Sequence, residues 1–108
     1  METKQEFVNK GLQHFAEKNY ERAIFFFRKA LECDAKFETA YRTLCESLNR
    51  LDEIDEAYKF AKKWLEINNK NPLAYLTLSK IYTQKGHKDE ARSALLKYQK
   101  LMAEQKTA

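Results

Sequence analysis

Few side chains in this sequence of 108 residues are of the types that ligate metals or act as catalytic bases. Its two histidines, His14 and His87, lie near opposite ends of the chain. Neither belongs to a cluster of Cys, His and carboxylate residues at the spacing that holds a metal ion. We therefore expect no metal site, with His14 half-buried in a core and His87 in a solvated turn.

The two cysteines, Cys33 and Cys45, are too few for a disulfide framework. A buried cysteine that is not a ligand usually behaves as a small hydrophobic side chain, and we expect this of both. From their small number we expect a reducing, cytoplasmic location.

The sequence also lacks the motifs that usually bind phosphate or form a catalytic triad. The only glycines are Gly11 and Gly86, so no glycine-rich phosphate loop exists. The serines have no neighbouring base in the order of a catalytic triad, and the carboxylates lie on faces expected to be solvated. We therefore expect no catalytic activity and no cofactor.

The charge of the chain suggests a possible class of partner. The net charge is +4, and it arises after residue 71, where seven basic residues face three acidic ones. These basic residues are spread around two expected helices and form no continuous stripe. Binding to nucleic acid is therefore less favoured than a solvated basic surface.

The elements that would carry a site are expected to be helices. The chain is 44% hydrophobic and 33% charged and has one proline, a composition that excludes disorder and a many-stranded sheet. No apolar run reaches the roughly 20 residues of a membrane span. Apolar spacing and cap residues predict six helices at residues 4–17, 20–33, 37–50, 53–67, 72–85 and 88–104.

The sequence repeats itself with a period of 34 residues. At this spacing small residues align with small ones and aromatic residues with aromatic ones. The aligned sets are Ala23, Ala57 and Ala91; Phe7, Tyr41 and Tyr75; and Gly11, Cys45 and Ser79. A fixed period of this length is typical of stacked helical pairs.

This pattern resembles the tetratricopeptide repeat (TPR), a helix-turn-helix unit of 34 residues. The repeats would be residues 4–37, 38–71 and 72–105, within one domain covering 1–108. The third is the best match, with Tyr75, Leu78, Tyr82, Gly86 and Ala91 at signature positions. The resemblance implies an all-α solenoid of about six helices in a right-handed superhelical stack.

In TPR stacks the first helix of each repeat lines a concave groove. By this resemblance the groove would be apolar at both ends and polar in the middle, a surface that suits a peptide segment. Its candidate binding residues are Val8, Leu12, Phe15, Arg42, Glu46, Asn49, Leu73, Leu76 and Lys80. In the alternative, Val8 and Leu12 cover the terminal repeat while Leu73 and Leu76 pack on neighbouring helices.

One family function can be compared residue by residue. TPR domains that hold the acidic tail of cytosolic chaperones clamp carboxylates with lysine, asparagine and arginine side chains. None of these types occurs at the matching positions, which are Val8, Leu12, Thr43, Leu73 and Thr77. We therefore expect no carboxylate-clamp binding of a chaperone tail.

Two features lie outside the groove. Phe25, in the run Phe25-Phe26-Phe27, points away from the core stripe of its helix, and it is a second candidate contact surface. The last helix carries Leu101 on an apolar side with no following helix to cover it. We interpret the chain as a non-enzymatic adaptor that binds a protein segment; the alternative is a scaffold that self-associates through Phe25 or Leu101.

Overall fold

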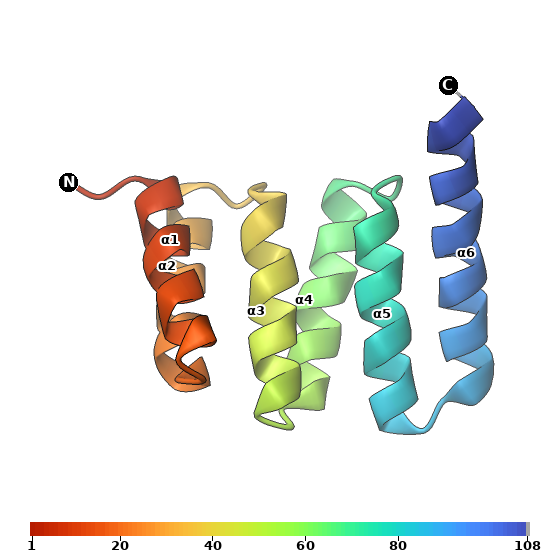
Figure 1. Ribbon diagram of the computed structural model, residues 1–108, viewed down its shortest axis with the longest axis horizontal. Coiled ribbons are helices and arrows are strands. Elements are labelled where there is room, and N and C mark those ends of the chain that lie inside the picture. The colour runs from red at the N-terminus through yellow and green to blue at the C-terminus, as the bar shows by residue number, and fades with distance from the viewer. Residues whose placement is uncertain (108) are drawn as a thin grey trace.

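The computed structural model describes residues 1–107, and this part of the chain is entirely helical, without strands. The predicted all-α class is therefore confirmed. The six helices lie side by side in sequence order (Figure 1). They are α1 (Lys4–Ala16), α2 (Tyr20–Cys33), α3 (Glu38–Arg50), α4 (Ile54–Ile67), α5 (Pro72–Lys85) and α6 (Lys88–Thr107).

The helices pack as three successive pairs. Within each pair the two helices are in contact, and α2 packs on α3 as α4 packs on α5. The first helices of the pairs also contact one another, α1 with α3 and α3 with α5. By contrast, α6 packs on α5 alone among the described helices, and its C-terminal turns extend beyond them (Figure 1).

Local side chains explain where several helices begin. Thr3 and Glu6 form a capping box at α1, each side chain hydrogen-bonded to the other's backbone N–H. Asn71 caps α5, with Pro72 at the first helical position, where its missing N–H costs no hydrogen bond. Both starts were predicted from these residues and are confirmed.

The turn inside each pair requires a left-handed residue. Gly86 ends α5 with φ of 80°, as predicted. Lys18 and Asp52, at the same place in the first two repeats, have φ of 62° and 60° although they carry side chains. The turn geometry is therefore common to all three repeats, and only the third uses the residue best suited to it.

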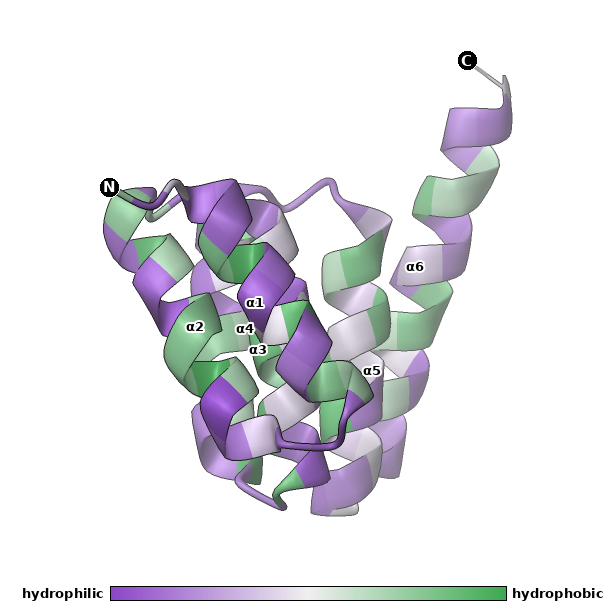
Figure 2. Ribbon diagram, turned by 60° about the vertical axis from the view of Figure 1, so that its left-hand side comes forward, coloured by the Kyte–Doolittle hydropathy of each residue, from purple (hydrophilic) through white to green (hydrophobic). Residues whose placement is uncertain are grey.

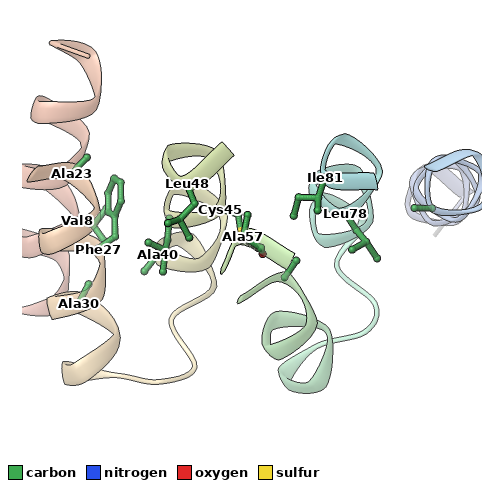
Figure 3. Packing of buried hydrophobic residues seen from close by; sticks show 13 residues of the cluster. Val8, Ala23, Phe27, Ala30, Ala40, Cys45, Leu48, Ala57, Leu78 and Ile81 are labelled. Carbon is green, nitrogen blue, oxygen red and sulfur yellow. Dashed lines mark hydrogen bonds between the residues drawn. The ribbon is translucent and has the colours of Figure 1, made fainter. Parts of the chain in front are cut away.

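The core is a line of buried side chains running from one repeat to the next (Figure 3). In repeat one, Gly11 lies directly against the fully buried ring of Phe27. At the equivalent positions repeat two has Cys45 and Ala61, so a larger residue on one helix accompanies a smaller one on the other. Coloured by hydropathy, the helix ribbons show hydrophobic and hydrophilic residues interspersed along each helix, as amphipathic packing requires (Figure 2).

Three expectations about exposure are wrong. Val8 is fully buried, because α1 packs on both α2 and α3 and so buries more than one stripe. Leu101 is only 8% exposed, because it lies seven residues, or two turns, beyond buried Ala94 on the same face of α6. Cys33 is exposed, at the last turn of α2, whereas Cys45 is buried as expected.

Candidate binding groove

The face formed by the first helices of the repeats holds two adjoining hollows of about 360 and 300 Å³. Three residues line both of them, namely Glu46 and Arg50 of α3 and Lys80 of α5. The larger hollow extends to α1, and the smaller one continues along α5. The first helices of all three repeats thus contribute to one continuous groove.

The α1 end of the groove is apolar. The side chain of Leu12 is 41% exposed. Phe15 is half-buried beside it and meets the ring of Tyr20 edge-on, with centroids 5.3 Å apart. Both residues were predicted to lie in the groove, and both line the larger hollow.

Arg50 is held at the centre of the groove by several contacts. Its guanidinium lies over the rings of Phe15 and Tyr20, 5.7 and 5.9 Å from their centroids. It donates a hydrogen bond of 3.1 Å to the Tyr20 hydroxyl and lies 3.4 Å from the Glu46 carboxylate. A guanidinium fixed in this way presents its remaining N–H groups without much loss of side-chain entropy.

Sequence reasoning missed Arg50, although a signal for it was present. Arg42, Glu46 and Arg50 follow one another at intervals of four residues, which places them on one face of α3. This face lies next to the buried face of α3. The sequence alone does not show on which side of the buried face the groove lies, and the packed structure does.

The polar part of the groove is positively charged. Arg42, Arg50 and Lys80 line it with Glu46 as the only carboxylate among the residues lining these two hollows. The Glu46–Arg50 pair is about half exposed on its arginine side, so its contribution to stability is only ~0–1 kcal/mol. An incoming carboxylate therefore meets a cationic surface that is incompletely neutralised.

Asn49 contributes an unsatisfied acceptor. Its side chain lines the smaller hollow, is 8% exposed, and its Oδ1 atom has no hydrogen-bond partner within the described chain. Because this oxygen is itself buried, a ligand in the groove does not reach it in this structure.

Comparison with known proteins identifies the family. A family model described as "Anaphase-promoting complex, cyclosome, subunit 3" matches residues 16–98, well over half of the chain. The chain belongs to this tetratricopeptide repeat (TPR) family. The curated Protein STIP1 homolog of Dictyostelium discoideum is 30% identical over 102 residues, which are 91% of this TPR chain but 18% of that protein.

Solved structures share the fold. MamA superposes with a TM-score of 0.90 at 21% identity, over 98% of this chain and 62% of that one. The first TPR of Spaghetti (RPAP3), bound to an HSP90 peptide, gives 0.87 at 17% identity, over 92% and 79%. The Yersinia enterocolitica type III secretion chaperone SycD, in complex with a peptide of the translocator YopD, gives 0.85 at 20% identity, over 92% and 76%.

The other predicted groove residues lie at the edge of the TPR groove. Leu73 lines a separate hollow of about 110 Å³ with Trp64 and Arg42, and Leu76 is half-buried outside the two main hollows. The alternative in which these two leucines pack on neighbouring helices fits Leu73, which packs against the cluster of Tyr41, Trp64 and Ala74.

Beside this small hollow a carboxylate connects the start of α3 to the end of α4 and to Asn71, the residue that caps α5. Glu38 accepts hydrogen bonds from Trp64 Nε1 at 2.6 Å, from Asn71 Nδ2 at 3.0 Å and from Asn68 Nδ2 at 3.1 Å. Partial burial is the largest single influence and raises the pKa of Glu38, but these hydrogen bonds together outweigh it and hold the pKa below its ordinary value. Glu38 is therefore charged and fully engaged in the structure.

Residues 1–107 contain no group of three or more His, Cys, Asp and Glu side chains arranged to hold a metal ion. Nor does this part of the TPR chain include a helix with the length and hydropathy needed to span a bilayer.

Proposed function

We propose that this TPR chain is a non-enzymatic, cytoplasmic adaptor that binds a protein segment in its concave groove. The observation that carries the proposal is the fixed Arg50 guanidinium. It lines one hollow together with the apolar side chains of Leu12 and Phe15 and the cations Arg42 and Lys80. This arrangement favours a peptide with an apolar side chain next to an acidic one.

The size and shape of the groove support a peptide over a small metabolite. Its two hollows follow one another across three helices and are open to solvent along that path, so an extended or helical segment can contact both at once. Two solved TPR structures of the same fold hold peptides, which agrees with this use of the groove.

In this mechanism the apolar end of the groove buries an apolar side chain of the peptide, and the cationic centre fixes the position of the peptide along the groove. Burying an apolar side chain against Leu12 and Phe15 removes water from both partners, and a carboxylate paired with Arg50 or Lys80 fixes the position along the groove. The residues are not those of the carboxylate clamp, so the expected ligand is an internal or terminal acidic-apolar segment rather than a chaperone tail.

A peptide-display selection tests the proposal. A random 12-residue library is selected against the native chain, and enriched peptides are titrated by fluorescence anisotropy. We expect enrichment of sequences that place Asp or Glu beside Leu, Ile, Met or Phe. Affinity should fall at least tenfold in Leu12→Glu and in Lys80→Glu, and should weaken as salt is raised.

The matched control is Lys59→Glu, which makes the same charge change as Lys80→Glu at an exposed position of α4 away from the groove. It should leave affinity within about twofold. Selected peptides without the acidic-apolar pattern, or peptides that bind the groove variants as tightly as the native chain, would refute the proposal.

A further inference from the structure

One position of the repeat differs sharply between the first two units and the third. Phe26 and Phe60 lie 34 residues apart, and the equivalent residue in repeat three is Ala94. Phe26 stacks on His14 and Phe7 of α1, with centroids 5.4 and 6.5 Å away. Phe60 lies 6.5 Å from the ring of Tyr41 in α3. In repeats one and two an aromatic ring therefore covers the junction of the paired helices.

Repeat three lacks this ring and has a hollow in its place. A hollow of about 350 Å³ opens between α5 and α6, lined by Tyr75, Tyr82 and Ala94 among others. Tyr75 is the counterpart of Tyr41, so the aromatic neighbour for a ring is present while the ring itself is absent. A cavity of ~150 Å³ with apolar walls already accepts benzene, so this hollow has room for a phenyl group.

The same chain also exposes one aromatic side chain. Phe25 is 52% exposed, and every other Phe, Tyr and Trp of the described residues is buried or half-buried. It projects from α2, and the Lys29 ammonium lies 5.5 Å from its ring centroid. The equivalent residues of repeats two and three are Lys59 and Ser93, so the repeat architecture does not require an aromatic residue here.

The charges around the two features are complementary. Basic residues Arg22, Arg28 and Lys29 lie within one turn of Phe25. Arg28 is paired with Glu56 at 3.5 Å and Lys29 with Glu32 at 3.4 Å, so among the described residues Arg22 is the cation of this set without a carboxylate partner. The hollow is bordered by Asp89 and Glu90 and by a single cation, Lys97. Lys97 is itself the counterpart of Lys63, which lies 5.5 Å from the ring centroid of Phe60.

We propose that Phe25 of one molecule inserts into the α5–α6 hollow of a second copy of this chain, where it takes the place that Phe26 and Phe60 occupy in their own repeats. Arg22, the cation beside Phe25 that has no carboxylate partner, then faces Asp89 and Glu90. This contact surface is separate from the concave groove, so a self-associated chain can still bind a peptide there.

Sedimentation velocity over a range of concentrations up to about 1 mM tests the inference, because a contact centred on one aromatic side chain is expected to be weak. The weight-average mass of the native chain should rise above 12.8 kDa as concentration increases. Phe25→Ser removes the inserted ring, and Ala94→Phe fills the hollow with the ring that repeats one and two contain. Each variant should remain monomeric, whereas the matched control Lys59→Ser should associate like the native chain.

Mixing the two variants gives the decisive result. The Phe25→Ser chain keeps its hollow and the Ala94→Phe chain keeps its exposed ring, so an equimolar mixture should form a complex of one molecule of each. Two variants that are monomeric both alone and when mixed would refute insertion, as would a native chain that stays monomeric throughout.

Circular dichroism first checks that Ala94→Phe is folded. If that variant does not fold, Asp89→Lys with Glu90→Lys replaces it, since both positions are exposed and reversing their charge should also abolish association. N-acetyl-phenylalanine amide provides a separate probe, monitored by NMR shifts of Tyr75 and Tyr82. Shifts in a native chain that remains monomeric would assign the hollow to an aromatic residue of another protein and overturn self-association.

Discussion

Replacing Gly11 with alanine tests the packing of the first repeat most directly. At an exposed helical site this change would stabilise the chain, because alanine exceeds glycine in helix propensity by ~1 kcal/mol. At Gly11, however, an added Cβ would lie 2.6 Å from Cδ1 and 2.9 Å from Cζ of Phe27, and nearer still to Cε1. Ordinary contacts of a Cβ atom begin at about 3.4 Å.

The ring cannot easily move away, because Phe27 is fully buried among the other core side chains. Overpacking of this kind typically costs ~1–3 kcal/mol, and contacts this short belong at the upper end of that range. After the gain in helix propensity, we expect Gly11→Ala to lower the free energy of unfolding by ~2 kcal/mol. For a domain of this size that corresponds to a melting temperature lower by ~8–16 °C.

Urea unfolding followed by circular dichroism measures the change, with Gln13→Ala as a control at an exposed position of the same helix. The control should stay within ~0.5 kcal/mol of the native chain. A second variant, Phe27→Leu, makes room for the new methyl group, so the double variant should be more stable than additivity predicts, by at least ~1 kcal/mol. A neutral or stabilising Gly11→Ala, or strictly additive effects, would show that the Phe27 ring is not what restricts position 11 to glycine.

Two further predictions concern ionisable groups. Glu38→Gln removes the charge that accepts hydrogen bonds from Trp64 and Asn68, so the variant should lose ~1–3 kcal/mol of stability at pH 7. Folding lowers the pKa of Glu38, so its contribution to stability is complete above the unfolded pKa and is lost as pH falls through the folded pKa. In chemical denaturation the two proteins should therefore converge only at pH values below the ordinary range of a glutamate carboxyl. Burial raises the pKa of the Cys45 thiol to about 12, whereas Cys33 is exposed. Iodoacetamide at pH 8 should therefore alkylate only Cys33 in the native chain and both thiols in urea, as measured by mass spectrometry. Equal labelling of both thiols in the native chain would contradict the burial of Cys45.

Much of the architecture was predictable because its determinants are local or periodic. Helix starts depend on cap residues a few positions apart, such as Thr3 with Glu6 and Asn71 with Pro72. The period of 34 residues repeats the same contacts in each unit, so one good match, in repeat three, fixes the alignment of the others.

The lining of the two hollows was predictable only in part. Leu12, Phe15, Arg42, Glu46, Asn49 and Lys80 line them, on the helices that their repeat positions indicate, and their role in binding stays a prediction. Val8 does not, because α1 contacts a second neighbour that a single-helix pattern cannot reveal. Arg50 was missed because its importance comes from Phe15 and Tyr20, which belong to a different repeat.

The sequence by itself therefore determined the number of helices, their turns and the order of the repeats, since these follow from capping, periodicity and local backbone preferences. The contacts between repeats determined which faces of each helix are buried by neighbouring helices. Helix packing alone buries Val8 and Leu101, fixes the Arg50 guanidinium and leaves a hollow beside Ala94 where two other repeats hold a phenylalanine. Such features depend on contacts between side chains that are far apart in the sequence. A local sequence pattern does not show which of these side chains come into contact.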